Sequence, residues 1–193
     1  MENTPIPKND ERINELVRKS QAGDSEAFGA LYEQFITPIY RYIYYRVGAE
    51  ETEDLTEMVF LKAWENIKQF RFGVHSFSSW IFRIAHNVIV DHYRLSRYNT
   101  EELPENVHDT RVEALASQRA HRSLNGRLIS DALAELKDDY RQVVILKYIN
   151  ELSNEEIGVV MERSQASLRI LQFRALRMLR KILEERGLTE LDL

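Results

Sequence analysis

The chain has no cysteine among its 193 residues, and this absence excludes a thiolate nucleophile, an iron–sulfur cluster, a zinc ribbon and a disulfide. Seven glycines and four prolines are too few for a collagen-like or largely disordered protein. The densest aliphatic stretch, Val143 to Leu146, is far shorter than the ~20 apolar residues of a membrane span, and the opening residues lack the apolar core of a secretion signal. We therefore expect a cytoplasmic protein that is not inserted in a membrane.

The motifs of common enzyme chemistry are missing too. The sequence contains no glycine-rich phosphate loop, no HExxH pair and no nucleophile elbow, so we predict no catalytic residue and no bound cofactor. His86 and His92 are six residues apart, which is not the i, i+4 spacing of two metal-binding histidines, and we interpret both as surface residues without a metal. The sequence thus predicts a protein that is not an enzyme.

Charge and aromatic content are strongly separated along the chain. The net charge is −5, but residues 50–57 carry five acids and no base, whereas residues 163–181 carry six cations and no acid. Sixteen of the nineteen aromatic residues lie before residue 99. Such different stretches are typical of two domains with different partners, and the acidic segment between them is typical of a flexible linker. We predict domains at residues 10–98 and 126–187, joined by a linker at 99–125.

Apolar residues recur with helical spacing on both sides of this linker, and no stretch alternates for long with the period of two that a β-strand requires. The sequence therefore predicts an all-α protein. Asp24 is placed to cap one helix, Ser153 and Glu156 form an S-x-x-E capping box, and Ser164 can cap the final helix. The expected helices are at about 10–22, 24–48, 50–69, 78–97, 127–136, 138–149, 153–161 and 164–185. The expected buried residues of the helix at 138–149 include Val143, Val144, Leu146 and Tyr148. The helix at 50–69 begins acidic and turns apolar through Val59, Phe60, Ala63, Trp64 and Ile67.

The last two helices form a helix-turn-helix pattern, because a short capped helix is followed by a turn of about three residues and a basic helix. In such a motif the second helix lies in the major groove of DNA. A basic face can also be merely solvated, but the capping box and the turn favour DNA binding here. We expect Leu168, Leu171, Ala175, Met178 or Leu179, and Ile182 to dock the helix. The residues left toward the groove are Ser167, Arg169, Ile170, Phe173 and Arg174.

Aromatic residues and arginines are interleaved between Phe70 and Tyr98. Unstacked bases can stack on such a surface while the arginines neutralise the nucleic-acid backbone. Aromatic residues at helical spacing are more often part of the core, as we expect for Trp80 and Ile84. Asn87 is less ordinary, because it lies in the middle of an apolar helix and its amide must find a partner or face outward.

At these residues the sequence resembles a bacterial RNA polymerase sigma factor of the extracytoplasmic function (ECF) type. The stretch EDLTEMVFLKAW (Glu53 to Trp64) resembles the family's polymerase-docking helix, and FSSWIFRIAHNVIVDHYR (Phe77 to Arg94) resembles its promoter-melting helix. Leu136 to Leu176 is similar to the family's helix-turn-helix domain. The resemblance implies two small helical domains, called sigma domains two and four, joined by the acidic linker. It also implies core RNA polymerase and promoter DNA as partners, with an anti-sigma protein as a further candidate.

The resemblance implies a role for each set of residues in promoter-specific initiation. Domain two docks on the clamp helices of the polymerase and captures the non-template strand of the minus-ten element, where the loop at 70–77 pockets a base that Asn87 reads. Domain four reads the minus-thirty-five element as duplex. The implied residues are Glu53, Asp54 and Glu57 for polymerase docking; Phe70, Arg71, Phe72, Phe77, Asn87 and Arg94 for the minus-ten strand; and Ser167, Arg169, Phe173 and Arg174 for the minus-thirty-five duplex.

Four positions depart from the commoner family pattern. Glu57 and Met58 stand where the docking helix usually has a glutamine followed by an acid, and Ile170 and Leu171 stand where small and basic residues are frequent. The promoter sequence therefore cannot be transferred. The alternative hypothesis is a helix-turn-helix transcriptional regulator whose first part is a helical signal-receiving domain. It explains residues 136–185 equally well, but it leaves the acidic helix and the aromatic loop unexplained.

Overall fold

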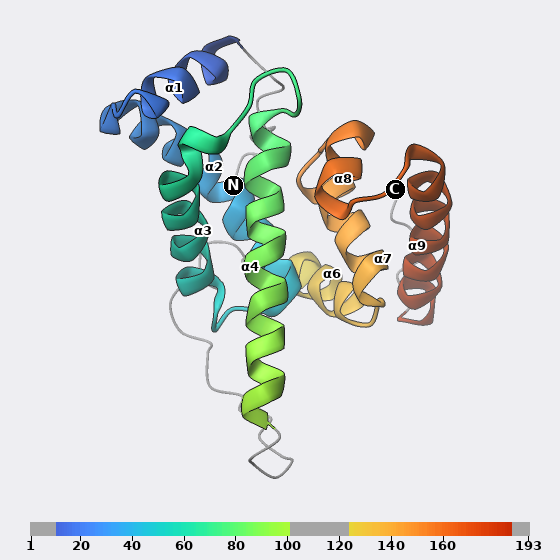
Figure 1. Ribbon diagram of the computed structural model, residues 1–193. Coiled ribbons are helices and arrows are strands. Elements are labelled where there is room, and N and C mark those ends of the chain that lie inside the picture. The colour runs from blue at the N-terminus through green and yellow to red at the C-terminus, as the bar shows by residue number, and fades with distance from the viewer. Residues whose placement is uncertain (1–10, 101–123, 187–193) are drawn as a thin grey trace.

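The computed structural model describes residues 11–100 and 124–186, and these residues are almost entirely helical (Figure 1). No β-strand occurs among them, which confirms the prediction of an all-α fold. We call residues 11–100 the first half and residues 124–186 the second half. The predicted linker at 99–125 falls mainly on residues 101–123, which lie outside the described residues.

The helices agree with the prediction, and their ends differ from it by no more than three residues when the π-helical turn at 145–149 is counted with the helix that precedes it. The first half consists of α1 (Glu11–Gln21), α2 (Ser25–Val47), α3 (Thr52–Asn66), the 3₁₀ turn η1 (Ile67–Gln69) and α4 (Phe77–Thr100). The second half consists of α6 (Leu124–Ala134), α7 (Asp138–Val144), the π-helical turn η2 (Ile145–Ile149), α8 (Asn154–Met161) and α9 (Gln165–Glu185).

The predicted caps are confirmed. Asp24 accepts hydrogen bonds from two free amides at the start of α2, both at 3.0 Å. At the start of α8, the Ser153 hydroxyl accepts from the Glu156 amide at 3.2 Å, and the Glu156 carboxylate accepts from the Ser153 amide at 2.9 Å. At the start of α9, the Ser164 hydroxyl accepts a hydrogen bond from the Ser167 amide at 3.3 Å. These caps fix where both helices of the helix-turn-helix begin.

The core of the first half lies between α2 and α4. Phe35 and Tyr42 of α2 meet Phe77 and Phe82 of α4 with ring centroids 5.2 and 5.4 Å apart, both in edge-to-face arrangements. All four rings are buried, and the edge of one ring faces the electron-rich surface of the next. This packing fixes one side of α4 against α2 and leaves the other sides available for contacts.

Close backbone approach shapes the turn of the helix-turn-helix. A Cβ atom on Gly158 of α8 would lie 3.1 Å from both the Arg163 carbonyl oxygen and Gln165 Nε2, so glycine lets the turn pack against α8. Glu162 ends α8 in the left-handed conformation, with φ of 53°. The turn is thus tight because one residue lacks a side chain and another adopts a strained backbone.

The structure corrects one predicted core residue in the second half. Tyr148 was expected to be buried with Val143, Val144 and Leu146, but it is 48% exposed while those three are buried. The π-helical turn η2 explains the difference, since its wider turn shifts the residues after Val144 out of the α-helical register. Of the two candidates for docking α9, Leu179 is buried and Met178 is exposed.

The two halves pack against each other. Helix α8 lies across α4, while η2 and α6 contact α2 (Figure 1). Among the described residues no helix is both long enough and apolar enough to cross a membrane.

Candidate nucleic-acid and polymerase-docking surfaces

Helix α9 presents a basic face to solvent. Leu168, Ala175 and Leu179 are buried beneath it and hold it on the second half. On the opposite side Phe173 is 68% exposed, which is unusual for so large a ring. The residues predicted to face the groove are the half-buried Ser167 and the exposed Arg169, Ile170, Phe173 and Arg174.

Arg169 and Arg174 lie on different edges of this face. A separation of five residues at about 100° each places them about 140° apart around the helix. Arg174 lines a pocket together with Ser167 and Ile170, whereas Arg169 lies one turn before Phe173, away from that pocket. The two arginines are therefore placed to make different contacts.

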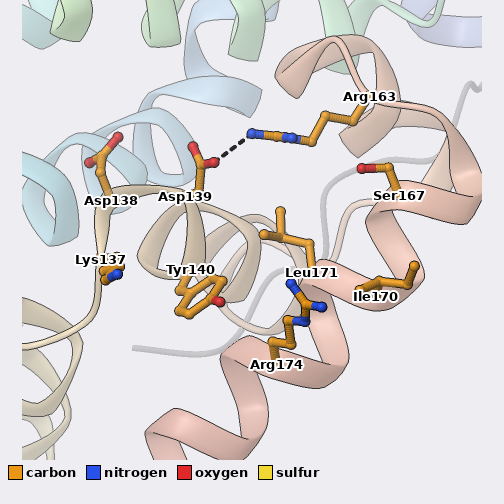
Figure 2. Close-up of a pocket in the computed structure, with 9 residues that line it drawn as sticks. All are labelled: Lys137, Asp138, Asp139, Tyr140, Arg163, Ser167, Ile170, Leu171 and Arg174. Atoms are coloured by element: carbon orange, nitrogen blue, oxygen red, sulfur yellow. Dashed lines mark hydrogen bonds and ion pairs between the residues drawn. The ribbon is translucent and has the colours of Figure 1, made fainter.

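The pocket lies between the start of α7 and the start of α9 and has a volume of about 500 Å³ (Figure 2). Figure 2 shows Arg163 reaching across it to form an ion pair with Asp139. Lys137 and Arg174 also line it, and neither has an ion-pair partner among the described residues. The pocket thus adds two cations beside the basic face. Lys137 carries no local sequence signal for this site, because the contact between α7 and α9 is not visible in the spacing of residues along the chain.

Asn87 lies on an exposed side of α4, as its sequence context allowed. Trp80, Asn87 and Arg94 are each seven residues apart, so they lie along one stripe of the helix. Trp80 is half-buried, and the exposed Arg94 pairs with Asp91 at 3.2 Å. A ring, an amide and a cation therefore follow one another along α4.

The loop before α4 differs from the prediction at two positions. Phe70 and Phe77 were assigned to strand binding, but they are only 5% and 1% exposed. They pack on each other and on Trp80, with centroids 5.4 to 5.8 Å apart. We therefore no longer assign either ring a direct contact with a base. Arg71 is exposed, and Phe72 is half-buried with the Arg18 guanidinium 4.9 Å above its ring.

Helix α3 exposes acidic and apolar side chains on the same face. Trp64, in the apolar part of this helix, is 38% exposed, and its ring meets that of Phe28 in an edge-to-face arrangement with centroids 4.8 Å apart. A helical projection of the sequence could have found this face, because its members fall within an arc of about 140°. We call six of the exposed residues within this arc the docking face, and they are Glu53, Asp54, Glu57, Met58, Leu61 and Trp64.

His86 is not a free surface residue, which corrects the prediction. It lies on α4 beneath the second half, and its Nδ1 is 2.9 Å from Nε2 of Gln142 on α7. Burial lowers the pKa of His86, and the nearby Arg46 acts in the same direction. The two partners are 56 residues apart, so no local sequence signal announces the contact.

Comparison with known proteins identifies both halves. Residues 31–97 match Sigma-70 region 2, and residues 126–179 match Sigma-70, region 4. The chain is 36% identical over 176 residues to the ECF RNA polymerase sigma factor BldN of Streptomyces coelicolor, covering 90% of this chain and 67% of BldN. It is 28% identical over 189 residues to the ECF RNA polymerase sigma factor SigW of Bacillus subtilis, covering 90% of this chain and 97% of SigW.

Solved structures show the same fold. CnrH, solved in complex with the cytosolic domain of CnrY, matches with a TM-score of 0.69 and 20% identity, over 90% of this chain and 98% of CnrH. RpoE of Bartonella quintana, solved in complex with the anti-sigma factor NepR, matches with a TM-score of 0.65 and 20% identity, over 81% of this chain and 96% of RpoE.

A helical chain with these two regions in this order is a promoter-recognising subunit of transcription. This chain belongs to the ECF RNA polymerase sigma factors. It directs promoter-specific initiation by core RNA polymerase, and the alternative of a separate helix-turn-helix regulator is not favoured, because the first half matches sigma region 2.

Proposed function

We propose that three exposed faces divide the work of initiation in this sigma factor. The docking face of α3 binds core polymerase, the stripe on α4 holds the minus-ten strand, and the basic face of α9 reads the minus-thirty-five duplex. The observation that carries the proposal is the exposed amide of Asn87 between Trp80 and Arg94 on one side of α4.

The stripe on α4 suits a single strand with unstacked bases. The half-buried Trp80 offers part of a ring for stacking, Arg94 offers a charge for a phosphate, and Arg71 adds a second cation in the preceding loop. The Asn87 amide carries both donors and an acceptor, as needed to recognise the edge of an extruded base. Phe70 and Phe77 support this surface from beneath.

The basic face of α9 suits a duplex. Arg169 and Phe173 are placed to reach base edges, since an arginine can grip guanine and a ring can touch a thymine methyl group. Arg174 lies beside Lys137 at the pocket, where two cations without ion-pair partners among the described residues suit a phosphate. Ser167, in the first turn of α9, offers a hydroxyl to the same backbone.

The docking face of α3 suits a protein partner. Three carboxylates provide electrostatic complementarity to a basic surface, here the clamp helices of the polymerase. Met58, Leu61 and Trp64 between them provide apolar area that a partner can remove from water. Glu57 and Met58, which depart from the commoner family pattern, are both exposed on this face.

Membership of this family supports a proposal for a further partner and for the domain boundaries. RpoE of Bartonella quintana was solved with the anti-sigma factor NepR, and we infer that an anti-sigma protein controls this factor as well. We assign sigma domain two to residues 10–98, the linker to 99–125 and sigma domain four to 126–187. The factor acts in the cytoplasm and carries no catalytic residue of its own, because the polymerase performs the chemistry.

The test is the substitution Asn87→Ala in reconstituted holoenzyme, with Val90→Ala as the control at another exposed position of α4. A lost base contact of about 1–3 kcal/mol should reduce promoter opening about 5- to 150-fold. Binding to core polymerase and formation of the closed promoter complex should be unchanged. Permanganate reactivity of thymines near the minus-ten element measures the opening, and a premelted bubble should restore it in part. If Asn87→Ala opens linear promoters like Val90→Ala, the assignment of α4 to strand capture is wrong.

A further inference from the structure

A group of buried polar side chains joins the two halves. Arg46 near the end of α2 donates through Nη2 to both carboxylate oxygens of Asp138, each at 3.0 Å, and through Nη1 to the Tyr42 hydroxyl at 3.2 Å. The Arg46 side chain is 1% exposed, whereas that of Asp138 is 61% exposed. A charge of the first half is therefore buried against an acid at the first residue of α7.

The Arg46–Asp138 ion pair is not suited to a permanent contact between the two halves. Burial of a guanidinium costs desolvation free energy, which is repaid only when the pair has good geometry and the remaining donors are satisfied. Among the described residues, Arg46 Nε is buried without a hydrogen-bond partner, and water competes for the exposed carboxylate of Asp138. The contact is therefore suited to an interface between the two halves that can separate.

Gln142 of α7 connects the second half to two helices of the first half. Its buried amide donates through Nε2 to the Tyr42 hydroxyl on α2 at 3.1 Å, and Nε2 lies 2.9 Å from His86 Nδ1 on α4. Both protons of the amide are thus directed at acceptors. His86 Nδ1 can accept only when the ring is neutral, with its proton on Nε2.

Helix α8 is tied to α4 through its own capping box. One oxygen of Glu156 accepts the hydrogen bond from the Ser153 amide, and the other accepts from the Ser76 hydroxyl of the first half at 2.8 Å. At the far end of α8, Glu162 pairs with Arg83 of α4. The first helix of the helix-turn-helix is therefore attached at its start to Ser76, the residue before α4, and at its end to α4 itself.

This packing restricts how far apart the two promoter-reading faces can be. Helix α8 packs on α4, and α9 packs on α8 (Figure 1). The α8 contact through Glu162 is at Arg83, four residues before Asn87 on α4. The minus-ten and minus-thirty-five elements are about 25 base pairs apart, or about 85 Å at 3.4 Å per base pair. A compact half of this size is only about 30 Å across. Two halves in contact therefore cannot place α4 and α9 on both elements at once.

We propose that this arrangement is a closed, inactive state of the free sigma factor, held by the Arg46–Asp138 ion pair and the hydrogen bonds of Gln142 to Tyr42 and His86. Polymerase and promoter DNA act on the open state, in which the halves separate. The inactivity of the closed state rests on the proposed division of promoter contacts between α4 and α9. The closure itself can be measured without polymerase or DNA.

The experiment uses energy transfer within the full-length chain. Because the sequence has no cysteine, Lys68→Cys and Lys181→Cys provide unique labelling positions on exposed sites, one in each half. Asp138→Asn leaves Arg46 without its carboxylate partner, while Asp139→Asn removes a neighbouring acid that pairs within the second half. We expect high transfer for the parent and for Asp139→Asn. For Asp138→Asn we expect a closed-to-open ratio about tenfold lower, with unchanged helix content by circular dichroism.

The outcomes separate closure from promoter function. Equal transfer in the parent, Asp138→Asn and Asp139→Asn, or low transfer in the parent, would overturn the closed state. If Asp138→Asn opens the factor and also speeds its assembly with core polymerase, both the closure and its inhibitory role are supported. If it opens the factor but no variant supports promoter-dependent transcription, the closure stands and the proposed division of promoter contacts fails.

Discussion

Helices α3 and α9 both present an exposed face, but the chemistry of the two faces is opposite. The face of α3 combines three carboxylates with Met58, Leu61 and Trp64, whereas the face of α9 surrounds Phe173 with arginines. Acids beside apolar groups suit a protein partner that excludes water, while cations suit the phosphates of a duplex. The comparison shows how a chain with a net charge of −5 can bind DNA, because the charge is divided between faces and not averaged over the surface.

The largest expected effect comes from reversing the charge of two acids on the docking face of α3. Reversing Asp54 and Glu57 to lysine should weaken binding to core polymerase about 100-fold, because truncating or reversing buried interfacial charges costs about 2–5 kcal/mol. Binding of the factor to an isolated minus-thirty-five duplex should not fall, because α9 is unchanged. Titration of labelled core polymerase measures the first effect.

The matched control reverses two acids elsewhere in the first half. Glu11→Lys with Glu15→Lys makes the same change in net charge on α1, where both acids are exposed. That control should retain affinity for core polymerase within about threefold, since surface charges away from an interface act mainly through screened fields. Equal losses in both double variants would show that net charge, and not the docking face, governs assembly.

The next largest effect is expected from alanine substitutions of Arg169 and Arg174, which lie on the two edges of the basic face of α9. Arg169→Ala should cost about 1–3 kcal/mol and relax specificity at one base pair if this arginine grips a base edge. Arg174→Ala should instead weaken all duplexes alike and reduce the salt slope by about one ion. Competition binding with single-base variants at several salt concentrations measures both quantities. Arg180→Ala, at an exposed arginine paired with Glu184 farther along α9, is the control.

Local sequence was sufficient for much of this molecule. It predicted the helices and the three caps, because each depends on residues within one or two turns. It was wrong about side chains whose burial depends on distant partners. Phe77 packs on Phe35 of α2, and His86 is covered by Gln142 from 56 residues away. Periodicity shows that a helix has an apolar side, but it does not show which other element covers that side.

Alanine substitutions at two glycines should change the stability of the two halves in opposite directions. Gly158→Ala should destabilise the second half by about 1–2 kcal/mol, because the added Cβ would lie 3.1 Å from the Arg163 carbonyl oxygen and force the turn apart. Gly29→Ala on α2 should stabilise the first half by about 0.5–1 kcal/mol, because nothing lies within 4 Å of its Cβ and alanine favours the helix. Denaturant unfolding measures both, and stabilisation by Gly158→Ala would contradict the close approach of α8 and the turn.

The smallest expected effect is a pH dependence of the closed state, centred on His86. Burial lowers the pKa of His86, and the charge of Arg46 on α2 lowers it further. The other charged groups that act on the ring are Asp138 at the start of α7 and Glu162 after α8, which raise its pKa, and Arg83 on α4, which lowers it. The closed state therefore binds fewer protons at this site than an open state in which His86 is hydrated. The contribution of His86 to the stability of the closed state is complete above the ordinary histidine pKa of about 6.5 and is lost as pH falls through and below that value.

Because the His86 pKa is lower in the closed state than in the open state, acid favours the open state. We therefore expect energy transfer between labels in the two halves to stay constant from pH 8 to about 7 and to fall toward pH 5.5. The change should be smaller than the tenfold effect of Asp138→Asn, because protonation disrupts one hydrogen bond while the Arg46–Asp138 pair persists. His86→Gln keeps an acceptor for the Gln142 amide but cannot titrate, so its transfer should not respond to pH over this range. The four other histidines remain in that variant, which isolates the contribution of His86. An identical pH response in the parent and in His86→Gln would place the titrating group elsewhere and leave closure dependent on the ion pair alone.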